Sequence, residues 1–220
     1  RLYHPQRDSL HYEQTPYWKA DRLMTTDVAA QKQALREQAH AQRNAQENKD
    51  ELSQQIVAQF MATPEYAQAK TVLFYVDVRS EVRTRHSLPA ALQSGKTIVI
   101  PWCTEAVELA LFRLESTDEL AVGMYKILEP KPELRLLPEK QVDPKAIDLV
   151  MVPGVAFDRR GARMGHGKGY YDKLLENVRP DAPLIALAFE CQLFPEIPVA
   201  PHDVFMNKII TEKGVLSPKS

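Results

Sequence analysis

Short apolar runs alternate with helix-like segments along most of the chain, and this alternation constrains the fold more than any other feature. The runs cover residues 71–76 (TVLFYV), 97–100 (TIVI), 148–153 (DLVMVP), 184–189 (LIALAF) and 208–212 (KIITE). Those at 148–153 and 184–189 are continuous rather than alternating, which is typical of strands buried on both faces. LPAALQSG and YYDKLLENV (170–178) lie between successive runs as crossover helices that parallel strands need. The sequence therefore predicts a three-layer α/β/α sandwich around a mostly parallel sheet.

Two further segments complete this prediction. Residues 109–114 (LALFRL) read as another strand, and the Pro-rich residues 129–138 read as an extended connection. Residues 27–62 have almost no Gly or Pro and are rich in helix formers. We expect N-terminal helices there, capped at Thr26 or Asp27, interrupted near residues 48–50 and ended before Pro64. Residues 1–26 show no regular spacing of apolar residues and are expected to be an extension. This leaves residues 27–220 as a single α/β domain.

Composition and charge exclude several classes of function. The 28 basic and 29 acidic side chains nearly cancel, so no broad basic field for nucleic acid or an anionic membrane is predicted. The two cysteines show no CxxC pairing, which argues against a disulfide scaffold or a zinc knuckle. No apolar run reaches the roughly 18 residues that a membrane helix needs, and the N-terminus is too polar for a secretory signal. We expect a cytoplasmic protein, monomeric or dimeric, that holds any charged ligand in a local cluster.

The densest chemical signal is the sequence RMGHGKGYYD at residues 163–172, between a buried strand and a helix. Ligands of open α/β sheets bind at the carboxyl ends of the strands. Three alternating glycines let backbone amides point into one concavity, and a helix N-terminus behind them favours an anion. Arg163 and Lys168 add two cations. The spacing matches neither the Walker loop nor the dinucleotide-binding loop, so composition alone leaves both a phosphate site and a flexible turn open.

The wider string at residues 153–172, PGVAFDRRGARMGHGKGYYD, resembles the signature of the 5-formyltetrahydrofolate cyclo-ligase (methenyltetrahydrofolate synthetase) family. Upstream, Lys32 and Arg36 resemble the family's K-x-x-x-R, and Glu81 with Thr84 resembles its E-x-(D/E)-T. Glu129-Pro130 and His202-Asp203, followed by IITE, extend the match in register. The resemblance therefore runs over about residues 27–212.

This resemblance implies an ATP-dependent enzyme of one-carbon metabolism that acts on a reduced folate. The implied reaction converts 5-formyltetrahydrofolate to 5,10-methenyltetrahydrofolate, with ADP and phosphate as the other products, through phosphorylation of the formyl oxygen. Such a site needs mainly alignment and charge neutralisation, with Mg²⁺ as cofactor. Neither a Ser-His-Asp nor a Cys-His arrangement is required.

The resemblance also assigns the site residues. It places Arg163 and Lys168 as catalytic, Val76, Glu81 and Tyr170 at the folate, and Asp172 and Asp203 on Mg²⁺. The ATP-binding residues it implies are Lys32, Arg36, Arg163, Met164, Gly165, His166, Gly167, Lys168, Gly169, Tyr170 and Tyr171.

Each group also has a plainer interpretation. Lys32 and Arg36 lie one helical turn apart and suit a solvated face. Asp172 suits the first turn of a helix, and Asp203 suits a turn. Tyr170 and Tyr171 suit a core.

Three positions depart from the family pattern. Arg83 replaces a usual acidic residue, Lys126 replaces a usual Gly, and Asn207 replaces a frequent Asp. Arg83 would either attract the carboxylates of a folate tail or point to solvent or pair with Glu81 or Asp77. One rival function is a non-catalytic nucleotide- or folate-binding paralogue. A second is a sugar-phosphate isomerase or acyl-transferase of similar architecture, since fold does not fix function.

Overall fold

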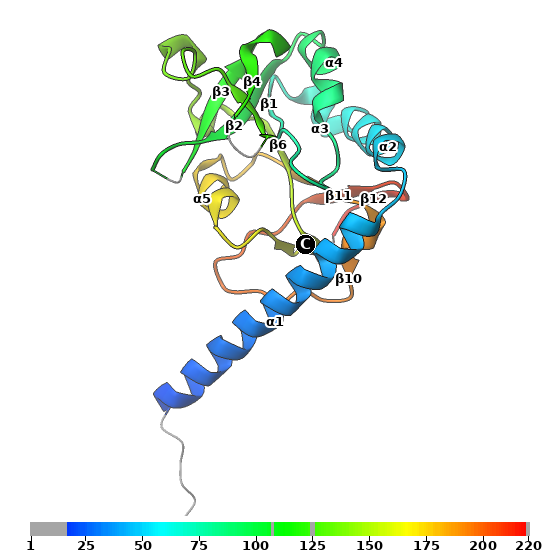
Figure 1. Cartoon of the computed structure of the whole chain (residues 1–220), viewed down its shortest axis with the longest axis vertical. Helices are drawn as coiled ribbons and strands as arrows, with labels where there is room; N and C mark the ends of the chain where they lie inside the picture. The colour runs from blue at the N-terminus through cyan, green and yellow to red at the C-terminus, as the bar shows by residue number, and fades with distance from the viewer. Residues whose placement is uncertain (1–16, 107, 124–125, 219–220) are drawn as a thin grey trace, which may run out of the picture.

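The computed structural model describes residues 17–106, 108–123 and 126–218 (Figure 1). Its α-helices are α1 (Tyr17–Ala45), α2 (Lys49–Met61), α3 (Pro64–Gln68), α4 (Leu88–Leu92) and α5 (Tyr170–Asn177). Its strands are β1 (Thr71–Leu73), β2 (Thr97–Cys103), β3 (Leu109–Leu114), β4 (Leu120–Val122), β5 (Leu128–Pro130), β6 (Leu149–Val152), β7 (Ala156–Asp158), β8 (Arg163–Met164), β9 (Leu184–Leu187), β10 (Leu193–Phe194), β11 (Lys208–Thr211) and β12 (Gly214–Leu216).

The centre of the fold is a seven-stranded sheet with the order β12-β11-β9-β6-β1-β2-β3. The five inner strands are parallel to one another, whereas the edge strands β3 and β12 pair antiparallel with β2 and β11. All residues of β6 and β9 are buried, as expected for continuous apolar strands covered on both faces. The prediction of a mostly parallel sheet is confirmed.

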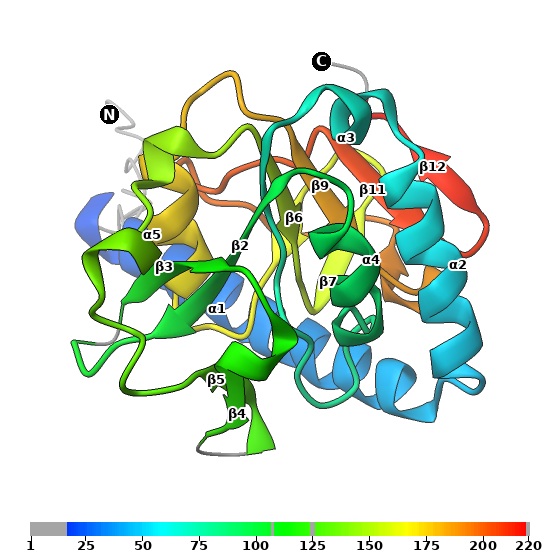
Figure 2. The same ribbon diagram turned by 90° about the horizontal axis from the view of Figure 1, so that it is seen from above.

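Helices cover both faces of this sheet (Figure 2). On one face, Ile56 and Phe60 of α2 and Leu88 of α4 pack in one apolar cluster with inward side chains of β1, β2, β6 and β9. On the other face, Leu174 and Leu175 of α5 pack against the alternate side chains of the same strands. Removal of this apolar surface from water is the main force that holds the three layers together.

Helix α1 extends away from the sheet at its N-terminal end (Figure 1). Its C-terminal half packs through Leu35 and Ala39 against a small sheet with the order β10-β7-β8. The predicted break follows Ala45, and α2 ends before Pro64 as expected. The predicted start at Thr26 or Asp27 is wrong, because the helix already begins at Tyr17. The first 16 residues of the predicted extension lie outside the described residues. No helix in the described part of the chain is both long and apolar enough to cross a membrane.

Two predicted segments differ from the structure. The strand expected over residues 71–76 ends at Leu73, because the Thr84 hydroxyl donates to the carbonyl of Tyr75 and draws the chain into a loop. Part of the expected connection at 129–138 is instead paired, since β5 forms an antiparallel ribbon with β4. The small sheet containing β7 and β8 was also not predicted, and it stands between β6 and the glycine-rich loop.

Candidate functional site

The glycine-rich loop joins β8 to α5, at the carboxyl-end side of the central strands. Gly167 and Gly169 have φ values of 92° and 71°, in the left-handed region that favours glycine. Gly169 is the N-cap residue of α5, so the loop leads directly into a helix N-terminus. Lys168 is exposed between these glycines, and it forms no ion pair with the described residues. The loop thus presents a glycine-rich backbone next to a helix start, and its lysine has no ion-pair partner among the described residues.

Arg163 is held rigidly below this loop. Its side chain is only 4% exposed, and it bonds Asp172 Oδ1 of α5 at 2.6 Å. A second bond runs from its Nη1 to the carbonyl of Pro153 at 3.1 Å, and the guanidinium lies 5.9 Å from the ring centre of Tyr171. An added Cβ at Gly165 would lie 3.1 Å from Nη1, so the glycine leaves room for the guanidinium. The guanidinium group of Arg163 is therefore already held in one orientation, and one of its N–H groups bonds a carboxylate oxygen.

Helix α1 brings one cation to this loop and a second to the turn at residues 200–203. Arg36 donates from Nε to the carbonyl of Gly165 at 3.0 Å, and Lys32 pairs with Asp203 at 2.9 Å. Burial on its own raises the pKa of Asp203, but hydrogen bonds from the Ala200 N–H and from Lys32 outweigh it and lower that pKa. The predicted basic pair of α1 thus contacts the loop and the 200–203 turn, and it is not a solvated face.

The predicted folate carboxylate, Glu81, is buried in the turn that follows β1. Its Oε2 accepts from the Val78 N–H at 3.0 Å, and its Oε1 lies 3.1 Å from Nε2 of His166. The His166 ring in turn lies 5.3 Å from the ring of His40 on α1. One side chain of the glycine-rich loop therefore contacts the predicted folate carboxylate directly.

The remaining aromatic and apolar candidates have separate surroundings, and of these Tyr171 is influenced by Glu81. Burial raises the pKa of Tyr171, and the negative charge of Glu81 raises it further. The Tyr170 hydroxyl contacts Cys103 at the end of β2, and this hydrogen bond raises the pKa of Tyr170. Val76 is partly buried and packs against the main core, and Met164 is buried against α1 in the small-sheet cluster.

Asp172 and Asp203 each bond a cation through one carboxylate oxygen. Within residues 27–218, leaving out the undescribed gaps, no three His, Cys, Asp or Glu side chains form a metal-binding group. Two carboxylates nevertheless fit Mg²⁺, which takes one or two carboxylates together with phosphate oxygens and water. The donor chemistry therefore fits a metal held jointly with a nucleotide rather than by protein alone.

The structure shows the contacts of two departures from the family pattern and the backbone conformation of the third. Arg83 pairs with Asp50 of α2 and donates its N–H to Ser53 at 2.9 Å, so it is bound to α2 and not to Glu81 or Asp77. Asn207 accepts from the Leu184 N–H at 2.7 Å and so joins the starts of β9 and β11. Lys126 has a φ of 60°, which explains why glycine suits this position.

Two residues of α1 near the site were missed by the sequence reasoning, His40 and the fully buried Arg43. The signal was present, because positions 32, 36, 40 and 43 repeat at helical spacing and share one face.

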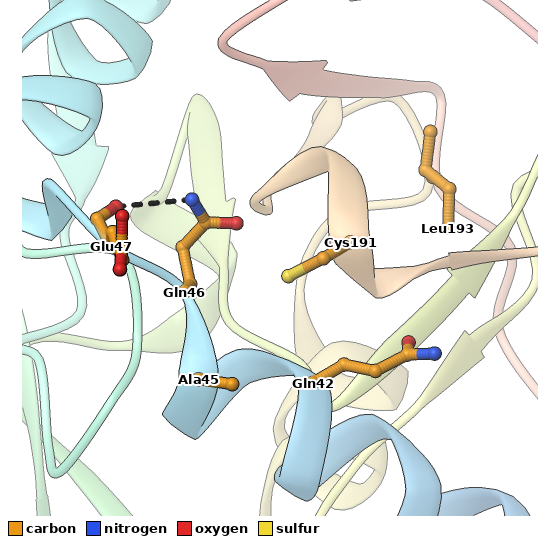
Figure 3. A pocket seen from close by; sticks show the side chains of 6 residues that line it. All are labelled: Gln42, Ala45, Gln46, Glu47, Cys191 and Leu193. Carbon is orange, nitrogen blue, oxygen red and sulfur yellow. Dashed lines mark hydrogen bonds between the residues drawn. The ribbon is translucent and has the colours of Figure 1, made fainter.

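A surface hollow of about 600 Å³ lies beside the C-terminal end of α1 (Figure 3). It is lined by Gln42, Ala45, Gln46, Glu47, Cys191 and Leu193. Burial raises the pKa of the Cys191 thiol, which disfavours a reactive thiolate. None of the predicted site residues lines this hollow, and it offers no cation for a phosphate.

Comparison with known proteins identifies relatives over nearly the whole domain. The sequence profile of the 5-formyltetrahydrofolate cyclo-ligase family matches residues 28–212. A probable 5-formyltetrahydrofolate cyclo-ligase of Schizosaccharomyces pombe is 31% identical over 180 residues, which cover 76% of this chain and 87% of the relative. The Mus musculus 5-formyltetrahydrofolate cyclo-ligase is 28% identical over 208 residues, covering 89% of this chain and 100% of the relative.

A solved structure shows the same fold. The NMR structure of the Aquifex aeolicus 5,10-methenyltetrahydrofolate synthetase superposes with a TM-score of 0.74 at 32% identity, over 86% of this chain and 93% of that one.

Proposed function

Because the chain belongs to the 5-formyltetrahydrofolate cyclo-ligase family, we propose that it uses ATP to convert 5-formyltetrahydrofolate to 5,10-methenyltetrahydrofolate. The observation that carries this proposal is the convergence of cations on one loop. Arg36 reaches it from α1, Lys32 of the same helix pairs with Asp203 in the 200–203 turn, and Arg163 and Lys168 belong to the segment itself. Such a cluster suits the phosphates of a nucleotide, whereas the net charge of the chain is near zero.

The proposed reaction has two steps. The formyl oxygen attacks the γ-phosphorus of ATP, the bond from that phosphorus to ADP breaks, and an iminium phosphate forms. The neighbouring aryl amine nitrogen then attacks the formyl carbon and loses its proton, and the C–O bond breaks to release inorganic phosphate. Phosphorylation is needed because an amide oxygen is a poor leaving group. The protein contributes alignment and charge neutralisation, as in other phosphoryl transfers.

The side chains of the nucleotide part have separable roles in this proposal. The guanidinium of Arg163 is held by Pro153 and Asp172, so its positive charge would offset phosphate charge from beneath the loop surface. Lys168 supplies a mobile point charge, and the N–H groups of Gly165, Gly167 and Gly169 suit the phosphate oxygens. Mg²⁺ held by Asp172 and Asp203 would neutralise charge on the transferred phosphoryl group.

The folate part of the proposal centres on Glu81. A buried carboxylate accepts hydrogen bonds only, and this suits the N–H donors of a pterin ring. Val76 and Tyr170 would line the same pocket. His166 contacts Glu81 from the nucleotide loop, so the two substrates would bind side by side, as phosphoryl transfer between them requires.

The test is to mix the protein with MgATP and 5-formyltetrahydrofolate and to follow the absorbance of methenyltetrahydrofolate together with ADP release. Growth of the band that depends on both substrates supports the proposal. A paralogue without activity would bind ATP yet release no phosphate in response to folate. Turnover of a sugar phosphate or acyl donor without nucleotide would point to the second rival.

The same proposal includes a cytoplasmic location and independence of nucleic acid and membranes. A monomer or dimer remains the prediction for the oligomeric state, and a single domain over 27–220 remains the prediction for its organisation.

A further inference from the structure

Arg43 is fully buried near the end of α1, where a charged side chain is unexpected. It has no carboxylate within ion-pair distance among the described residues, and its Nη2 atom is buried without a hydrogen-bond partner there. Burial lowers the pKa of Arg43, and the charge of Glu81 is the strongest influence that opposes this. A buried guanidinium without an ion-pair partner is unfavourable for stability alone, so its presence here calls for another explanation.

The two hydrogen bonds of Arg43 point to that explanation. Its Nε donates to the hydroxyl of Ser80, and its Nη1 donates to the carbonyl of Gly154, each at 3.0 Å. Ser80 belongs to the turn after β1 and Gly154 to the turn after β6. These two strands are parallel neighbours, with Leu73 opposite Val150. Arg43 therefore ties together the two turns at the carboxyl ends of the central strands.

The first of these turns presents the proposed folate carboxylate. Glu81 follows Ser80 directly, and its Oε2 closes the turn by accepting from the Val78 N–H. Within the turn, Arg79 has a φ of 53°, a strained value for a residue other than glycine. A strained turn needs external contacts to stay in place. The bond from Arg43 to Ser80 is one of them, and the Tyr75 hydroxyl adds another at the carbonyl of Val82.

The second turn holds Arg163, which we place near the phosphates. Pro153, which precedes Gly154, accepts a hydrogen bond from Arg163 at 3.1 Å. Gln192 also donates to the carbonyl of Gly154, at 2.9 Å, so this turn has two buried supports. Ser80, by contrast, has no side-chain partner other than Arg43 among the described residues. Loss of Arg43 should therefore affect the Glu81 turn more than the Arg163 turn.

We propose that Arg43 is a positioning residue that fixes Glu81 against the phosphate-binding loop from behind the site, without contacting either substrate. This inference rests on the proposed function. It assigns to α1 a second role, distinct from that of Lys32 and Arg36, which contact the 200–203 turn and the loop from the same helix.

A double-mutant cycle between Arg43→Met and Glu81→Gln tests this role. We expect each single variant to raise the KM for 5-formyltetrahydrofolate about tenfold, and the double variant to raise it little more than the larger single effect, because directly coupled residues are non-additive. The KM for ATP should change less than the KM for folate in Arg43→Met. Arg43→Lys keeps the positive charge but loses the planar guanidinium that makes both hydrogen bonds. We therefore expect it to raise the KM for 5-formyltetrahydrofolate less than Arg43→Met does.

Arg179→Met is the matched control, since Arg179 bonds Asp148 at the opposite, amino ends of β1 and β6. It should alter the unfolding temperature without altering the folate KM. If Arg43→Met does not fold, the cycle with Arg43→Lys replaces it. The role of Arg43 would be overturned if the two single increases in the KM for 5-formyltetrahydrofolate multiplied in the double variant. Equal changes in the KM for ATP and the KM for folate would also overturn it. In either case, turnover by the wild-type protein would still support the proposed function. A wild-type protein without methenyl product would overturn both.

Discussion

Replacing Lys168 by alanine separates the binding of nucleotide from the stability of the fold. Lys168 is exposed and makes no ion pair with the described residues, so its removal should change the free energy of unfolding by no more than about 0.5 kcal/mol. A charge-assisted hydrogen bond to phosphate is worth roughly 1.5–3 kcal/mol. We therefore expect Lys168→Ala to weaken binding of ATP and lower kcat/KM for ATP by about tenfold or more.

Calorimetric titration with a non-hydrolysable ATP analogue measures this loss, and steady-state kinetics measures the accompanying loss of turnover. Lys173→Ala is the matched control, because Lys173 is an exposed lysine on α5 just beyond the loop. Its removal should leave both quantities unchanged. An affinity for the analogue that is the same in Lys168→Ala and wild type would show that the glycine-rich loop does not hold phosphate through this cation.

Three further changes have defined outcomes. Asp172→Asn should move the Mg²⁺ titration of activity to higher concentration, whereas an unchanged curve would remove Asp172 from the metal site. Lys126→Gly should raise the free energy of unfolding in urea by about 0.5–1 kcal/mol, because it relieves a left-handed backbone, and no gain would contradict this. The lowered pKa of Asp203 stabilises the fold above the pKa of the unfolded chain. This contribution is lost as pH falls through the folded value, so Asp203→Asn should flatten the fall of the unfolding temperature below about pH 4, and equal slopes would refute it.

The sheet was predictable from sequence where burial alone decides the structure. The runs at 149–152 and 184–187 became β6 and β9 because strands covered on both faces need continuous apolar side chains. Residues 74–76 are aromatic and β-branched and also suit a strand, yet they leave it, because Thr84 competes for the backbone of Tyr75. That contact joins residues nine positions apart through a side chain, so the pattern of apolar residues along the sequence cannot predict it.

The site residues were predictable where charged residues and glycines are adjacent in one short segment. They were less predictable where they are spread along a helix. The 163–172 segment stood out because its glycines and cations are adjacent. Arg43 did not, because a basic residue on a polar helix is usually solvated, and its burial depends on turns that lie far away in the chain. Arg83 shows a similar limit. The sequence left it open between the folate tail, solvent and a pair with Glu81 or Asp77, but Asp50 of α2, more than thirty positions upstream, binds it.

The fate of the formyl oxygen tests the central claim most directly. In the proposed reaction this oxygen attacks the γ-phosphorus and later leaves with it, so 5-formyltetrahydrofolate labelled with ¹⁸O in the formyl group should yield inorganic phosphate that carries the label. Mass spectrometry of the phosphate after a single turnover with MgATP gives the answer. One ¹⁸O per phosphate is the predicted result. Unlabelled phosphate beside labelled water would contradict phosphorylation of the formyl oxygen at this site.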